Sequence, residues 1–300
     1  MAQIGIIGSG NVGANTAFFV AERNVAHVCM YDVKGGLSTG KALDMMEAAP
    51  LRGYQYKLSG TDSIGDALAS DVVIVAAGEV REPGMKREDL FEKNRAVVEE
   101  VAGALASYEG VVIVATEPVD LLTQVIVSKG LPWERVLGIG GVLDSARLRV
   151  LVARELKVAQ EDVKTMVVGR HADDMIALPA YCSVGGVPVT KLMTEERFSQ
   201  LVRETVDAGD HIVGLAKRTS SYYGPAAAAT DVAEAVIRGT NRILPVSVQL
   251  QGQYGISGVA MSLPALIGAG GVERVLEPVL TDGEKVRLEQ SAKALKAYAA

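Results

Sequence analysis

The chain has 300 residues, a formal net charge of −6 and two cysteines, Cys29 and Cys182. This length allows one large domain or two ordinary ones. The acidic balance gives no basic footprint for nucleic acid, no apolar run reaches the length of a membrane span, and two cysteines do not make a disulfide framework. We therefore expect a cytoplasmic protein that binds neither nucleic acid nor membranes.

The first thirty residues combine a strand, a glycine turn and a helix. Residues 4–7 form a short apolar run that is typical of a buried parallel strand. A helical run at 14–23 and a second strand at 28–31 lead to Asp32. Between the first strand and the helix lies the glycine-rich segment Gly8-Ser9-Gly10-Asn11-Val12-Gly13.

This spacing predicts a dinucleotide site. Gly8 allows the tight turn, Gly10 lets the backbone approach a pyrophosphate, and Gly13 lets the helix pack against its strand. The helix N-terminus offers N–H groups to phosphate. Asp32 would bind the ribose hydroxyls and repel a 2′-phosphate, so the pattern favours NAD over NADP. The alternative, a glycine turn without a ligand, does not require the strand, helix and acid around it.

Helices and strands alternate over the next hundred residues. We expect helices at 37–48, closed by Pro50, and at 90–108 and 118–127. Expected strands are 54–59, 71–78, 111–115 and 136–139, and an exposed, movable loop covers 79–88. This alternation predicts a Rossmann-type doubly wound parallel sheet, an α/β fold, over residues 1–140.

Ligands bind outside the carboxyl ends of the strands in such a sheet. Besides the glycine turn and Asp32, the residues expected there are Ala77, Gly78, Ala115, Thr116 and Glu117. They should converge on one crevice.

The pattern changes after Gly140-Gly141, and residues 141–300 read as an α+β substrate and catalytic domain. Helices are expected at 143–156, with Asp144 in the first turn, and at 194–215, 226–237 and 282–298. Antiparallel strands are expected at 165–168 and 180–189, with a turn at Gly185-Gly186, and a hairpin from 244–250 and 255–263.

One of the three histidines has a chemical setting. His27 and His211 are most simply surface residues, whereas His171 follows a strand end. A lone loop histidine is more often inert than catalytic. However, Asp144 and Arg147 share a helix face, and Asp144 beside His171 would fix its tautomer and create an acid/base near neutral pH. Arg147 offers a bidentate fork for a carboxylate.

The sequence resembles the lactate/malate dehydrogenase family from end to end. It is most similar to the lactate-dehydrogenase-like malate dehydrogenases of bacteria. Besides the glycine turn, the matching segments include Arg81-Glu82-Pro83-Gly84-Met85, Pro118-Val119-Asp120, Gly141-Val142-Leu143-Asp144-Ser145-Ala146-Arg147 and Gly252-Gln253-Tyr254-Gly255. The resemblance implies an NAD-dependent 2-hydroxyacid dehydrogenase, a small dicarboxylic 2-hydroxy or 2-oxo acid as substrate, and a homodimer or homotetramer without a catalytic metal.

The resemblance also implies roles for matching residues. His171, oriented by Asp144, would exchange the substrate proton, and Arg147 would hold the C1 carboxylate. Arg87 would polarise the carbonyl group, and Arg81 would bind the second carboxylate. Asn94 would touch the cofactor ribose or the substrate, and Ser220 would lie near the nicotinamide. Without the resemblance, Arg81 and Arg87 are most simply solvated loop charges.

Two departures from the family pattern concern the substrate site. Glu117 replaces an asparagine that donates to the substrate oxygen, and Arg170 and Ala172 replace glycines on either side of His171. We expect Glu117 and Arg170 to form a compensating ion pair. The lost amide donor predicts low turnover with oxaloacetate, which Glu117→Asn should raise.

The sequence therefore predicts a malate dehydrogenase that interconverts malate and oxaloacetate. Two alternatives stay open at this point. Glu117 and Arg170 could select a different 2-oxo acid, or the protein could be an NAD-binding homologue with impaired catalysis. Five residues argue against the second alternative, because an inert homologue has no chemical need for all of them: His171, Asp144, Arg147, Arg81 and Arg87.

Overall fold

The computed structural model describes the chain except residues 1, 56, 81–84, 86–87, 217–219 and 300. In this part of the chain, the central element is a nine-stranded sheet with the order β14-β13-β12-β6-β5-β4-β1-β2-β3. Its parallel strands are β1 (Gln3–Ile7), β2 (His27–Tyr31), β3 (Leu58–Thr61), β4 (Val72–Val75), β5 (Val111–Val114) and β6 (Val136–Gly138).

The six parallel strands have the order β3-β2-β1-β4-β5-β6, which is the Rossmann order with a switch point between β1 and β4. Three antiparallel strands extend the sheet beyond β6: β12 (Arg242–Gln251), β13 (Ser257–Gly268) and β14 (Gly271–Val275). The expected Rossmann sheet is confirmed, and the expected C-terminal hairpin is present as its extension.

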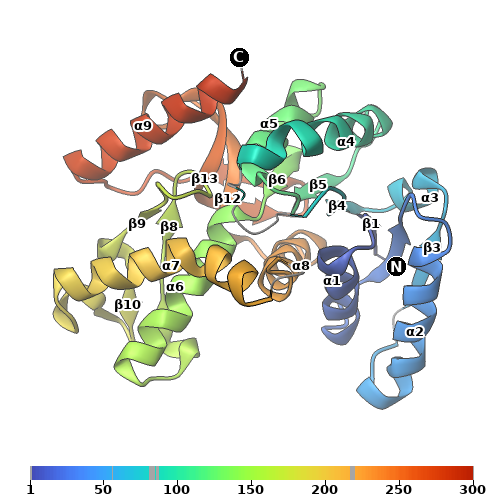
Figure 1. Cartoon of the computed structure of the whole chain (residues 1–300), viewed down its shortest axis with the longest axis horizontal. Coiled ribbons are helices and arrows are strands. Elements are labelled where there is room, and N and C mark those ends of the chain that lie inside the picture. Colours follow the sequence, from blue (N-terminus) through green and yellow to red (C-terminus); the bar gives the residue numbers. More distant parts are fainter. Residues whose placement is uncertain (1, 56, 81–84, 86–87, 217–219, 300) are drawn as a thin grey trace.

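Helices cover both faces of this sheet. In Figure 1, α1 (Asn11–Glu22) and α8 (Tyr223–Ile237) lie against one face, and α4 (Phe91–Ala104) and α5 (Val119–Ser128) lie against the other. The remaining α-helices are α2 (Leu37–Arg52), α3 (Ile64–Leu68), α6 (Gly140–Leu156), α7 (Glu195–Ala216) and α9 (Asp282–Ala299).

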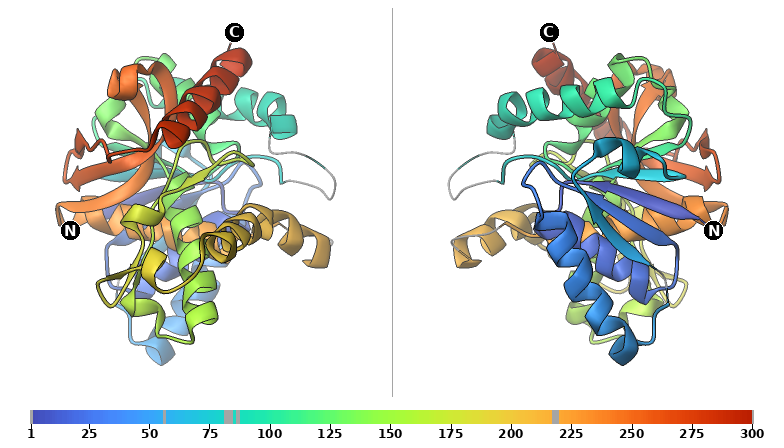
Figure 2. Two further views of the ribbon diagram at one scale, coloured as in Figure 1. Left: turned by 90° about the vertical axis from the view of Figure 1, so that its left-hand side faces the viewer. Right: turned by 90° about the vertical axis from the view of Figure 1, so that its right-hand side faces the viewer.

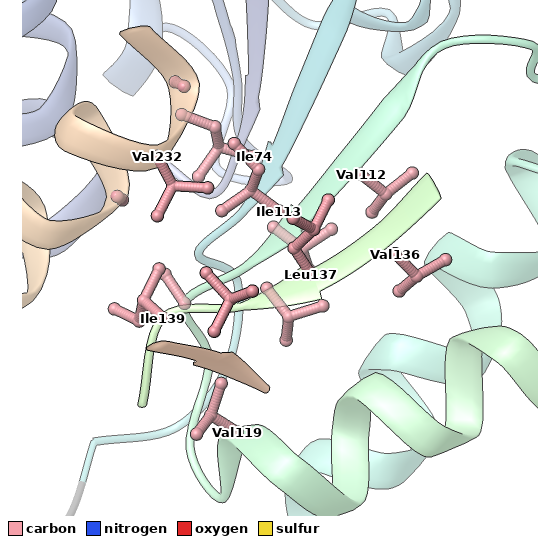
Figure 3. Packing of buried hydrophobic residues seen from close by; sticks show 14 of the residues in the cluster. Ile74, Val112, Ile113, Val119, Val136, Leu137, Ile139 and Val232 are labelled. Carbon is pink, nitrogen blue, oxygen red and sulfur yellow. The ribbon is translucent and has the colours of Figure 1, made fainter. Parts of the chain in front are cut away.

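The core forms where the central strands meet these helices. The sequences of β4 and β5 are Val-Val-Ile-Val in both cases, and all eight side chains are buried because both sheet faces are covered. Figure 3 shows Ile74, Ile113 and Leu137 packed together with Val232 of α8. The same cluster includes β12, β13 and α9, so both the core and the sheet run across residue 140. The division into domains 1–140 and 141–300 stays a prediction.

Several expected elements need correction. Pro50 lies inside α2, and Gly53, in a left-handed conformation with φ 78°, ends the helix instead. A proline in the last turn removes only one hydrogen-bond donor, so the helix continues past it. Helix α6 begins at Gly140, which places Asp144 beyond the first turn.

The expected strands at 54–59, 165–168 and 180–189 also differ from the structure. The third strand begins only at Leu58, because the Tyr54 side chain is buried and its hydroxyl donates to the Met45 carbonyl. Of residues 165–168, only Val167–Val168 form a strand. In the segment 180–189, Tyr181 and Cys182 donate to the Leu178 and Pro179 carbonyls in a 3-10 turn, so the first strand begins only at Ser183. The short strands between α6 and α7 are β7 (Val163–Lys164), β8 (Val167–Val168), β9 (Ile176–Ala177), β10 (Ser183–Val184) and β11 (Val187–Pro188).

The central strands should dominate the stability of the fold. Val112→Ala in β5 removes two carbons from a fully buried side chain, and we expect it to lower the free energy of unfolding by about 1.5–3 kcal/mol. Val279→Ala, at a side chain that is 85% exposed, should change it by less than about 0.5 kcal/mol. Denaturant unfolding checks both values, and equal losses in the two variants would contradict this view of the core.

Candidate active site

The glycine turn joins β1 to α1 at the switch point of the sheet. Gly8 has a φ of +98°, and a Cβ atom at Gly13 would lie 1.9 Å from the Gly8 carbonyl oxygen. Both positions therefore require glycine. A Cβ atom at Gly10 would meet no atom within 4 Å, so this backbone faces open space. Helix α1 begins at Asn11 and has no acidic residue in its first turn, which suits a phosphate.

Asp32 lies at the end of β2 and is fixed against this turn. Its Oδ2 accepts from the Ser9 N–H at 2.7 Å, and its Oδ1 accepts from the Lys34 N–H at 3.0 Å. Lys41 Nζ donates to the Ser9 carbonyl at 2.6 Å. A carboxylate held in this position beside the turn fits a ribose diol and disfavours a 2′-phosphate.

A pocket lies at the carboxyl ends of the parallel strands. Figure 2 shows α7 and the start of α4 extending on the same side of the molecule. Gly209 and Val213 of α7 line the pocket, together with Leu90, which directly precedes α4. Of the residues expected in the site, those that line the pocket are Val12, Gly78, Ala115, Thr116, Glu117, Arg147, His171 and Ser220. Arg81 and Arg87 lie outside the described residues. The structure thus brings residues from both halves of the sequence into one pocket.

Asn94 connects two of the strand ends beside this pocket. Its buried side chain accepts from the Glu79 N–H at 2.7 Å and donates to the Glu117 carbonyl at 2.6 Å. Thr116 adds a second connection, because its hydroxyl donates to the Ala77 carbonyl at 2.8 Å. The amide of Asn94 therefore holds the backbone that leads to Glu117.

His171, which lines the pocket, forms a buried contact with Asp144. His171 Nδ1 lies 2.6 Å from Asp144 Oδ2, and each side chain is only 2% exposed. The predicted contact between these residues is therefore present. A carboxylate on Nδ1 keeps a proton on that nitrogen, so Nε2 is left as the atom that can exchange a proton in the pocket.

Arg147 lies on the same face of α6 as Asp144. Its Nη1 is 3.7 Å from Asp144 Oδ1, and its side chain is 12% exposed. The guanidinium lines the pocket together with His171 and Ser220. A largely buried guanidinium at this point can receive a carboxylate beside the proton-exchanging nitrogen.

Asp120 was given no role from the sequence, although it is a buried acid that bears on His171. Its Oδ2 accepts from the His171 backbone N–H at 2.6 Å, and its Oδ1 accepts from the Ser247 hydroxyl at 2.6 Å. Burial raises the pKa of Asp120 to about 6, although the Ser247 and His171 donors act in the opposite direction. The signals in the sequence were an aspartate in the first turn of the helix after Pro118 and the match of Pro118-Val119-Asp120 to the family.

The two departures from the family pattern have partners other than those expected. In the described part of the chain, Arg170 Nε pairs with Asp174 Oδ1 at 2.9 Å, and Glu117 Oε1 lies 3.5 Å from His171 Nε2. Among the described residues no ion pair joins Glu117 to Arg170, so the expected pair is not formed there; Arg170 meets a carboxylate four residues along its own loop, and Glu117 meets the imidazole. Ala172 is buried and is not among the described non-glycine residues with positive φ, so it does not need the glycine that the family has there.

A Rossmann sheet with a dinucleotide turn, next to a buried histidine–aspartate pair and an arginine, defines a Rossmann-type dehydrogenase. Residues 2–138 match the NAD-binding domain model of the lactate/malate dehydrogenases, and residues 141–299 match the model of their α/β C-terminal domain. The chain belongs to the lactate/malate dehydrogenase family, and its cofactor is NAD.

Similar proteins share the whole length of the chain. The malate dehydrogenase of Methanosarcina barkeri is 42% identical over 99% of this chain and 97% of its own. The crystal structure of Cryptosporidium parvum malate dehydrogenase has a TM-score of 0.97 at 33% identity, covering 99% of this chain and 97% of that chain. The lactate dehydrogenase of the same organism, complexed with lactic acid and NAD, has a TM-score of 0.95 at 34% identity, covering 99% and 96%.

The described residues include neither a membrane-spanning helix nor a metal-binding cluster. No helix there is long and apolar enough to cross a membrane. Within the same residues, no group of three or more histidine, cysteine, aspartate or glutamate side chains is placed to hold a metal ion.

The raised pKa of Asp120 predicts a pH-dependent stability. Its folded pKa of about 6 lies above the ordinary 3.8, so the folded state keeps a proton that the unfolded state loses. The stabilisation is complete below about pH 4 and is lost as the pH rises to about 6. Asp120→Asn keeps an acceptor for His171 and donates to Ser247. We compare the free energy of unfolding of Asp120→Asn with that of the wild type. The difference, variant minus wild type, should increase by about 2–3 kcal/mol as the pH rises through this range.

Urea unfolding at pH 4 and pH 7.5 measures this difference. Asp207→Asn, at an exposed position of α7, serves as the matched control and should show no such dependence. An Asp120→Asn effect of the same size at both pH values would show that the buried carboxyl group is not protonated in the folded state.

Proposed function

We propose that this protein is an NAD-dependent malate dehydrogenase, which interconverts malate and oxaloacetate. The observation that carries the proposal is the buried His171–Asp144 pair beside Arg147, at the carboxyl ends of the Rossmann strands. The proposal is further supported by the malate dehydrogenases of similar length and sequence. Neither a different 2-oxo acid nor lost catalysis finds support among these relatives.

Each polar group of the pocket has a role in this proposal. NAD, when bound, supplies the hydride acceptor for C2 of malate and the hydride donor in the reverse reaction. His171 Nε2 takes the proton of the C2 hydroxyl group during oxidation and returns it during reduction. Asp144 stabilises the imidazolium and fixes its orientation, and Arg147 holds the C1 carboxylate. Ser220 lies at the nicotinamide end of the pocket in this assignment.

The remaining substrate contacts are assigned to two arginines of the 79–88 segment. Arg87 polarises the C2 carbonyl oxygen, and Arg81 binds the second carboxylate of oxaloacetate. These two assignments rest on the family resemblance of the sequence around them. A guanidinium is suited to both roles, because it stays charged and presents paired donors to carboxylate oxygens.

We also propose a homodimer or homotetramer in the cytoplasm. The assembly is supported by large apolar side chains that are exposed in the monomer, such as Leu43 and Leu51 of α2 and Tyr223 of α8. The location is supported by Cys29 and Cys182, which are both buried and not linked by a disulfide.

The activity is tested by NADH oxidation with a panel of 2-oxo acids. Oxaloacetate should be reduced faster than pyruvate, and NADH should be used in preference to NADPH because of Asp32. His171→Gln should lower kcat by about 10²–10⁴-fold, because the proton donor is lost. His211→Gln, at an exposed position of α7, should leave kcat unchanged. Reduction of another 2-oxo acid but not of oxaloacetate would refute the proposal.

Arg81 should set the selectivity for dicarboxylates. Arg81→Gln should reduce kcat/KM for oxaloacetate by an amount equivalent to about 2–5 kcal/mol, because a desolvated charge pair is lost, while pyruvate loses far less. Arg95→Gln is the control, since Arg95 pairs with Glu99 on α4. Equal losses for oxaloacetate and pyruvate in Arg81→Gln would show that Arg81 does not contact the second carboxylate.

A further inference from the structure

Glu117 approaches the reacting nitrogen of the site. It follows β5, where the Asn94 amide holds its carbonyl, and its Oε1 lies 3.5 Å from His171 Nε2. The Glu117 side chain is 30% exposed, whereas that of His171 is 2% exposed. Glu117 thus reaches from solvent to the atom of His171 that must face the substrate oxygen.

Among the described residues, three carboxylates face His171. Asp144 faces Nδ1 from α6, Asp120 accepts from the backbone N–H from α5, and Glu117 faces Nε2 from the end of β5. Of the nearby cations, Arg147 Nη1 lies 3.7 Å from Asp144, and Arg170, on the loop of His171 itself, pairs with Asp174. Arg81 and Arg87 lie outside the described residues. Carboxylates on both ring nitrogens favour the imidazolium form.

We propose that Glu117 holds the proton on His171 Nε2 in the substrate-free enzyme and yields this position to the substrate oxygen. The proposal rests on the function proposed above and adds a residue to its proton chemistry. The Glu117 carboxylate then contacts the proton-donating Nε2 of His171 until oxaloacetate binds and replaces it there.

This arrangement favours one direction of the reaction. Oxaloacetate reduction needs a protonated His171, because C2 receives the hydride while the C2 oxygen takes the proton from Nε2. Malate oxidation needs a neutral His171, because Nε2 must take the hydroxyl proton as the hydride leaves C2. By stabilising the imidazolium, Glu117 prepares the free enzyme for oxaloacetate and raises the pH at which malate can react.

The pKa of His171 can be measured directly by NMR titration of the imidazole signals. The chain has only three histidines, so spectra of His27→Gln, His171→Gln and His211→Gln assign every signal. In the full-length, ligand-free protein, we expect Glu117→Gln to lower the pKa of His171 by about one unit or more, since an opposite charge within 4–6 Å shifts a pKa by about 1–3 units. Glu117→Asp, with a shorter side chain, should give a smaller fall.

Glu79→Gln is the matched control. Glu79 lines the same pocket, and its backbone N–H is held by Asn94. This variant should change the pKa of His171 by less than Glu117→Gln does, because the Glu117 carboxylate is the one that faces Nε2. Unchanged signals of His27 and His211 show that each variant is folded. An equal pKa of His171 in the wild type and in both Glu117 variants would overturn the proposal.

Kinetics separate this proposal from the function on which it rests. With saturating NADH, kcat/KM for oxaloacetate should fall at a lower pH in Glu117→Gln than in the wild type, in the same direction as the NMR shift. The rise of kcat/KM for malate with saturating NAD should move in the same direction. An NMR shift without activity on either substrate would refute malate dehydrogenase activity, while Glu117 would still be shown to hold the proton.

Discussion

The buried carboxylate of Asp120 is the contact on which the geometry of the site depends. It belongs to α5, accepts from the backbone of His171, and accepts from Ser247 of β12. Three segments that are far apart in the sequence are therefore fixed by one side chain. Burying this carboxylate is unfavourable unless both oxygens have donors, so the network has only one satisfactory arrangement. The position of the His171 main chain follows from it, and Asp144 then fixes the ring.

The two charges that depart from the family pattern fit into this network by separate means. Arg170 pairs with Asp174, whose other oxygen accepts from Ser291 of α9, so the loop that carries His171 is held to the C-terminal helix. Glu117 meets His171 itself. The first contact connects the loop to α9, and the second acts on the reacting nitrogen. Arg170 therefore affects the position of the loop that carries His171, and Glu117 affects the protonation of His171.

The local sequence pattern was sufficient to predict the parallel half of the fold, because buried Val-Ile strands and glycine turns are determined by residues that are neighbours in the sequence. It also led to His171, Asp144 and Arg147. It failed where distant contacts decide the outcome. The C-terminal hairpin extends the main sheet, which no local pattern specifies, and Pro50 is tolerated because the helix ends soon after it. The Glu117–Arg170 pair was inferred from charge alone, whereas the partners depend on loop geometry. Asp120 was missed for the same reason, since its importance comes from two residues 51 and 127 positions away.

The central claim is that this pocket transfers a hydride between NAD and C2 of a dicarboxylic acid, with His171 exchanging the proton. Isotope transfer tests it most directly. NADH that carries deuterium at the transferred C4 position is incubated with the enzyme and equal concentrations of oxaloacetate and pyruvate, and the products are analysed by mass spectrometry and NMR. The account predicts malate with one deuterium at C2 as the main product. Deuterated lactate as the main product, or no deuterium in either acid, would contradict it.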